Sequence, residues 1–187
     1  MAKTETDSSV TTARRRIRRA AGVALLLGGA AVAAAWLWLP PRWVAVPAGA
    51  DVGERLGYAL RVDLPVFLWL LGCVQAVSTG RYRSDADIRG SASSPPSPKI
   101  AVRAAVLQNS LEQTVVFVGA QLALASLLAG DELVLLPVLT GVWLVGRIAF
   151  AIGYARDPIG RAFGMVLTVL PSLVAMGTAA GLVLAGR

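Results

Sequence analysis

The sequence predicts an all-α integral membrane protein that crosses the bilayer five times, as a bundle of four helices preceded by one additional N-terminal helix. Two observations support this prediction. Hydrophobic residues make up 56% of the 187 residues and the mean hydropathy is +0.64, which is unlike an ordinary soluble domain. The apolar residues also gather in five segments, each close to the ~20 residues that a helix needs to cross a ~30 Å hydrocarbon core.

The first 40 residues are expected to form a basic tail and the additional helix. Residues 1–19 are polar and then arginine-rich, so we expect a disordered tail with nothing to bury. Residues 20–40 are apolar, with Trp36 and Trp38 near the far end, where interfacial aromatic residues gather. An alternative is a secretory signal peptide cleaved near Ala48-Gly49-Ala50, although this apolar run exceeds the usual length of such a segment.

Four further spans are expected after residue 61. Residues 41–61 contain proline, glycine and both charge signs, which predicts an extracytoplasmic loop with a short interfacial helix over 52–60. A charged and then Ser/Pro-rich connection over 80–99 is typical of a flexible link between spans. The remaining predicted spans are 62–79, 101–129, 133–154 and 161–185, and Pro171 is expected to kink the last of them.

The charges favour five spans and argue against a nucleic-acid partner. The net charge is +7, but the basic residues lie in short segments that flank apolar runs and do not line one soluble face. With residue 1 in the cytoplasm, 14 Lys and Arg residues lie inside and 4 outside, as the positive-inside rule requires. We therefore expect a multi-pass protein of the inner cell membrane with a cytoplasmic N-terminus.

The chain contains no histidine and a single cysteine, Cys73. This composition excludes histidine-based catalytic triads and an intrachain disulfide, and it leaves no candidate metal site. Cys73 lies in an apolar run and is expected to be a small buried side chain. Any chemistry therefore falls to Arg, Tyr, Glu and Asn side chains.

The third predicted span begins with a polar cluster, QNSLEQ, at residues 108–113. On a helix, Gln108, Asn109, Glu112 and Gln113 share an arc of roughly 140°. Because ionisable groups at membrane depth usually face a bundle interior or a water-filled cavity, we expect this arc to face inward, with Arg147 as the partner of Glu112. Hydrogen bonding between neighbouring helices is the purely structural alternative.

Helix 133–154 ends with a second group of side chains that could contact a ligand. Arg147, Phe150 and Tyr154 lie three and four residues apart and so share one face. Arg161 follows the next turn, and Arg81 ends the second span at the same predicted side of the membrane. These cations and amides would suit an anionic, peptide-like ligand, although Arg161 alone could be a topology determinant and Tyr154 alone an interfacial anchor.

The pair Asn109 and Glu112, in an N-x-x-E pattern, followed by GRIAFAIGYARDPIGR at 146–161, resembles the MAPEG family of membrane proteins in eicosanoid and glutathione metabolism. The resemblance covers roughly residues 62–186. It implies a MAPEG-like four-helix membrane domain over 62–187, a homotrimer with sites between subunits, and glutathione as the cofactor.

The resemblance also implies residue roles. Asn109 and Glu112 would contribute to the glutathione site, Tyr154 would contact the tripeptide, and Arg161 would activate its thiol, while Gln108 and Arg147 match positions that are polar in that site. Two departures are visible. The family's glutathione-binding arginine usually stands where this chain has Ala105, and its second tyrosine stands where this chain has Phe150.

Two functions follow from these observations. The first is a glutathione-dependent transferase or peroxidase that acts on lipophilic electrophiles in the lipid bilayer. The second is a non-catalytic membrane protein that retains the MAPEG fold and binds a lipid or a protein partner. A small-solute transporter is disfavoured, because five spans without an internal repeat offer no symmetric alternating-access device.

Overall fold

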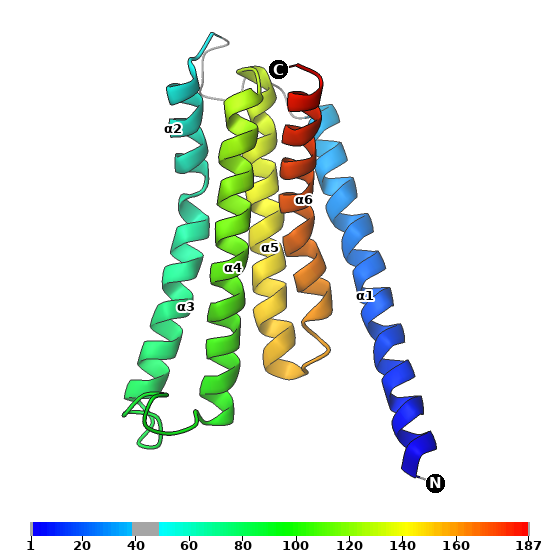
Figure 1. Ribbon diagram of the computed structural model, residues 1–187, viewed down its shortest axis with the longest axis vertical. Helices are drawn as coiled ribbons and strands as arrows, with labels where there is room; N and C mark the ends of the chain where they lie inside the picture. The colour runs from blue at the N-terminus through cyan, green and yellow to red at the C-terminus, as the bar shows by residue number, and fades with distance from the viewer. Residues whose placement is uncertain (1, 39–48, 187) are drawn as a thin grey trace.

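The computed structural model describes residues 2–38 and 49–186, and this part of the chain is helical with no strand (Figure 1). Five segments are long and apolar enough to cross a membrane, with Val52–Tyr82 counted as one. This confirms the predicted all-α membrane architecture. The helices are α1 (Ala2–Trp38), α2 (Val52–Val62), α3 (Leu64–Tyr82), α4 (Pro98–Leu127), α5 (Leu135–Arg156) and α6 (Ala162–Leu184), with a short 3₁₀ helix, Asp131–Val134, before α5.

Helix α1 corrects one expectation about the N-terminus. We expected residues 1–19 to be a disordered tail, but α1 begins at Ala2 and runs without a break to Trp38. Starting a helix is costly whereas extending one is not, so the membrane span can carry helical structure outward into the polar segment. Residues 41–48 of the predicted loop over 41–61, and with them Ala48 of the candidate cleavage site, fall outside the described residues.

Helices α2 and α3 follow one another with Asp63 between them. Asp51 caps α2, because its side chain accepts a hydrogen bond from the Glu54 backbone N–H at 2.8 Å and the Glu54 carboxylate accepts one from the Asp51 backbone at 3.0 Å. This confirms the short helix predicted over 52–60, whereas its interfacial position stays a prediction. The carboxylate of Asp63 is fully buried and accepts hydrogen bonds from Gln121 and Thr140.

Helix α5 lies at the centre of the bundle and packs closely on α6. Its Trp143 is fully buried and stacks on Phe117 of α4, with 5.5 Å between ring centroids. Gly146 of α5 and Gly164 of α6 let the two backbones approach, because a Cβ at either position would overlap backbone atoms of the other helix. Helix α1 packs on the outside of α6 and α5.

The polar segments predicted to share one membrane depth do lie at one end of the molecule. The α3–α4 connection, the α5–α6 turn and the start of α1 are together at the lower end in Figure 1. Helix α2, the turn between α4 and α5, and the C-terminus lie at the opposite end. The polar start of α4 therefore faces the polar end of α5.

Candidate functional site

Arg147 is the centre of the polar site. It is fully buried, yet its guanidinium donates to Asn109 Oδ1 and to Ser110 Oγ, each at 2.8 Å. The two bonds tie the second half of α5 to the first half of α4. A cation buried at membrane depth is costly unless such groups satisfy it, and Asn109 was one of the residues expected here.

Aromatic rings complete the surroundings of Arg147. Its Cζ lies 4.4 Å from the centroid of the Phe150 ring and 5.9 Å from that of Trp143. Both distances allow cation–π attraction, which is stronger where water is excluded. Its Nε has no hydrogen-bond partner within the described part of the chain, so one donor of this buried group is unused.

The predicted contact between Glu112 and Arg147 does not form within one chain, so this prediction is wrong for the single subunit. Glu112 is exposed and its carboxylate accepts a hydrogen bond from the neighbouring Gln108 amide at 3.0 Å. The rotation of α4 explains this result, because Asn109 and Ser110 face α5 and the Gln108–Glu112 pair then points out of the bundle. The expectation that the whole arc faces inward is therefore corrected for these two residues.

Tyr154 and Arg161 lie together at the end of the bundle where α5 turns into α6. The Arg161 Cζ is 4.9 Å from the centroid of the Tyr154 ring, and this ring lies 5.7 Å from the Phe150 ring at an angle of 59°. Phe150 contacts both Arg147 and Tyr154, so the Tyr154 ring connects the buried Arg147 cluster to the exposed Arg161. Arg161 stands directly before α6, where the backbone dipole adds positive potential.

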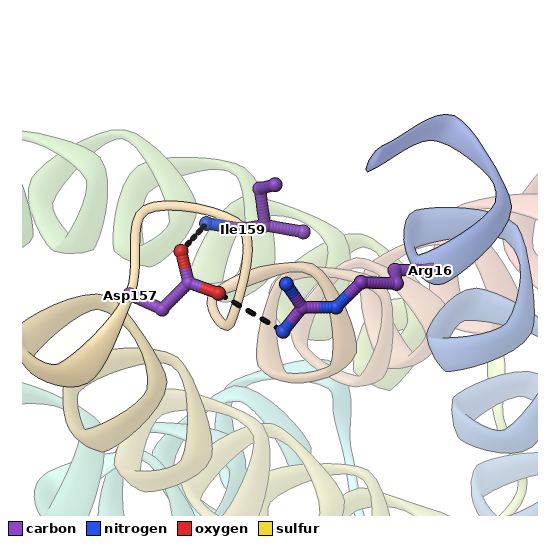
Figure 2. A network of polar contacts seen from close by, with 3 residues as sticks. All are labelled: Arg16, Asp157 and Ile159. Atoms are coloured by element: carbon purple, nitrogen blue, oxygen red, sulfur yellow. Dashed lines mark hydrogen bonds and ion pairs between the residues drawn. The ribbon is translucent and has the colours of Figure 1, made fainter. Parts of the chain in front are cut away.

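Asp157, the acidic residue nearest to Arg161 in the chain, is paired elsewhere. Figure 2 shows Arg16 of α1 contacting Asp157 at 3.0 Å, while the other carboxylate oxygen accepts from the Ile159 backbone N–H at 3.1 Å. Over residues 10–38 and 49–186, no carboxylate forms an ion pair with Arg161. The positive charge of Arg161 therefore remains available at the surface.

Arg81 stands apart from this group. Its guanidinium donates to Ser91 Oγ in the α3–α4 connection, so its contacts lie with that loop and not with Arg147 or Tyr154. Its assignment as a ligand residue remains a prediction.

Sequence reasoning missed two parts of the polar interior. Ser110 stood in the predicted cluster but was not assigned to the site, although its position beside Asn109 was a signal. The second part is the set formed by Asp63, Gln121 and Thr140, in which the Gln121 amide also donates to the Leu136 carbonyl at 3.1 Å. The available signal was Gln121, a single amide side chain in the apolar second half of the third predicted span. Over the described residues, no group of three or more His, Cys, Asp or Glu side chains could hold a metal ion.

Comparison with known proteins agrees with this architecture. The family model described as "MAPEG family" matches residues 64–181, from the start of α3 into α6. The chain belongs to the MAPEG family. It is a multi-pass integral membrane protein of that family, and α1 and α2 lie outside the matched MAPEG region. No curated protein and no solved structure matches the chain.

Proposed function

We propose that this MAPEG protein is a glutathione-dependent transferase or peroxidase that acts on lipophilic electrophiles. The observation that supports this most is Arg161, which lies over the Tyr154 ring at the start of α6 and has no ion-pair partner among residues 10–38 and 49–186. A phenol and an exposed cation at a membrane edge can receive an anionic peptide from water and an apolar reactant from lipid. The glutathione ligands would be Asn109, Glu112, Gln108 and Tyr154, with Arg147 positioning Asn109.

Arg161 is assigned the activation of the thiol. A thiol with a pKa near 8.5 is mostly protonated at neutral pH, and a cation within about 4–6 Å lowers the pKa by about 1–3 units. The thiolate would attack an electrophilic carbon to form the S–C bond, the leaving group would depart with the bonding electrons, and the thiol proton would pass to water. The electrophile would arrive laterally from the bilayer.

A homotrimer would complete the site. Gln108 and Glu112 form an exposed polar pair on an α4 face that also exposes Leu111, Val115 and Val116. A carboxylate exposed to lipid costs about 2.5–3.5 kcal/mol or more, so this face favours contact with another subunit. Contact along α4 would cover Glu112 and place it beside a neighbouring chain. The proposed location is the inner membrane with the N-terminus in the cytoplasm.

The alternative is a non-catalytic MAPEG protein that binds a lipid or a protein partner. Ala105 and Phe150 favour it, because they lack the arginine and phenol expected at these positions of a glutathione site. In this case Arg147 would serve only to hold α4 and α5 together.

Glutathione binding followed through thiolate absorbance separates the two functions. Wild-type protein in detergent should raise the thiolate signal of added glutathione at neutral pH, and Arg161→Ala should abolish the rise. Arg156→Ala removes another exposed arginine of the same turn and is the matched control, which should behave as wild type. A wild-type signal equal to that of Arg161→Ala would reject the catalytic proposal, and a missing glutathione isotherm would favour the non-catalytic one.

A further inference from the structure

A basic hollow lies at the end of the bundle where α3 meets the α3–α4 connection and the start of α4. Its volume is about 480 Å³, within the range of ordinary ligand sites. Three of its lining side chains are cationic, Arg83, Lys99 and Arg103, against one carboxylate, Asp87. None of Asn109, Arg147, Tyr154 and Arg161 lines it.

Most of the cationic side chains of this basic hollow have no side-chain partner among the described residues, whereas its carboxylate accepts hydrogen bonds from two neighbours. Arg83 and Lys99 are exposed, and neither forms an ion pair or a side-chain hydrogen bond with another described residue. Arg103 donates one bond, to the Ala76 carbonyl at 3.0 Å. Asp87 is 4% exposed and accepts hydrogen bonds from the Ser84 hydroxyl at 2.5 Å and the Ser97 backbone N–H at 2.8 Å. The hollow therefore presents net positive charge to an incoming group.

An apolar groove adjoins the basic hollow. The groove has a volume of about 370 Å³, and the two cavities share Gly72, Ala76 and Arg103 in their walls. From there the groove is lined by apolar side chains of α3, α4 and α5, among them Leu68, Trp69 and Val106. Leu68 and Trp69 are nearer the middle of α3 than Gly80 and Arg83 are, so the groove extends from the helix ends toward the membrane interior.

We propose that the basic hollow and the apolar groove together bind one anionic phospholipid. Its phosphodiester would pair with Arg83 and Lys99, which have no competing partner in the described part of the chain, and one acyl chain would lie in the groove beside Trp69. Charge complementarity selects an anionic headgroup, and the adjoining apolar walls select an amphiphile over a soluble anion. This site is separate from the proposed glutathione ligands and does not depend on catalysis.

The role of the basic hollow is tested by native mass spectrometry of the detergent-purified protein. The protein is titrated with phosphatidylglycerol or with phosphatidylcholine of the same acyl chains. Wild type should bind phosphatidylglycerol more tightly. Each basic residue near an anionic lipid surface contributes about fivefold in affinity, so Arg83→Ala with Lys99→Ala should weaken phosphatidylglycerol binding up to about thirtyfold. Arg89→Ala with Arg156→Ala removes two exposed arginines of the same end that do not line the hollow and should change nothing.

Gly72→Leu tests the apolar part. A Cβ at Gly72 meets no atom within 4 Å, so the larger side chain can enter the shared wall without disturbing the fold. It should weaken binding of both lipids, whereas Gly177→Leu, at an equally open position on α6, should not.

Three results would overturn the proposal. The wild-type protein would bind the two lipids with equal affinity, or the Arg83/Lys99 and Arg89/Arg156 double variants would lose the same affinity for phosphatidylglycerol. The third result is displacement of phosphatidylglycerol by glutathione. Displacement would assign the basic hollow to the tripeptide. A failure of the thiolate assay would leave this lipid measurement unaffected.

Discussion

Replacing Gly164 by alanine should separate the two helices that hold Tyr154 and Arg161. A Cβ at this position would lie 2.5 Å from the Phe150 Cα and 2.6 Å from the Gly146 carbonyl oxygen, and closer still to the Phe150 backbone nitrogen. These obstacles are backbone atoms of α5, which cannot rotate away as a side chain could. Helix α6 must therefore move.

The size of the effect follows from the geometry. Carbon atoms pack best at about 3.5–4.0 Å, so relief of the overlap requires a shift of roughly 1 Å. Overpacking of this kind typically costs about 1–3 kcal/mol, and we expect the upper end because both helices resist bending. Gly177→Ala is the matched control on the same helix. Its Cβ would meet no atom within 4 Å, so better helix propensity should stabilise it by about 0.5–1 kcal/mol.

The free energy of unfolding of both variants is measured in mixed micelles. The proportion of dodecyl sulfate is increased and the loss of helix is followed by circular dichroism. The free energies of unfolding should differ by about 3.5–4 kcal/mol, with Gly164→Ala the less stable. The Gly164→Ala protein should also lose thiolate formation even where it remains folded, since Arg161 moves with α6. Equal stability of the two variants would refute the close contact between α5 and α6.

Three further outcomes are expected. Arg147→Met should change the free energy of unfolding by no more than about 1 kcal/mol. The variant loses stabilising hydrogen bonds and ring contacts, but it also removes the cost of a buried charge. A loss above about 3 kcal/mol in the micelle assay would contradict this. Arg16→Ala should cost less than about 1 kcal/mol, since both partners of its ion pair with Asp157 are partly exposed, and a larger melting loss than for Arg18→Ala would show otherwise. Hydrogen bonds from Ser84 and Ser97 hold the pKa of Asp87 below its ordinary value. The ionised carboxylate therefore stabilises the α3–α4 connection above the ordinary pKa, and this contribution disappears as the pH falls through the lowered one. The hydrogen-exchange protection factors of residues 83–97, which correct for the intrinsic dependence of exchange on pH, should fall at acidic pH in wild type. Protection factors that do not change with pH would disprove the role of Asp87.

The sequence was sufficient to predict the five membrane-spanning segments and to place the two groups of polar side chains toward the same end of the bundle. Span length follows from bilayer thickness, and the turn at Asp131–Val134 is too short for anything but antiparallel neighbours. Asn109 and Arg147 were therefore expected at one end, and they form a hydrogen bond there.

The rotation of each helix about its own axis could not be predicted. Helical periodicity fixes which residues share a face but not which neighbour that face meets, so the inward orientation assigned to Glu112 was wrong. Close contacts between distant segments were equally hidden, because the need for glycine at position 164 arises only when α6 lies on α5. The polar set around Asp63 was missed since its three members are far apart in the sequence.

Helix α1 packs against α6 and α5, and the family match begins only at residue 64. The four spans α3 to α6 thus carry α1 on one flank, away from the α4 surface that exposes Gln108 and Glu112. Packing on this flank leaves the exposed α4 surface open, so the additional helix and the proposed contact between subunits do not compete for the same side of the bundle.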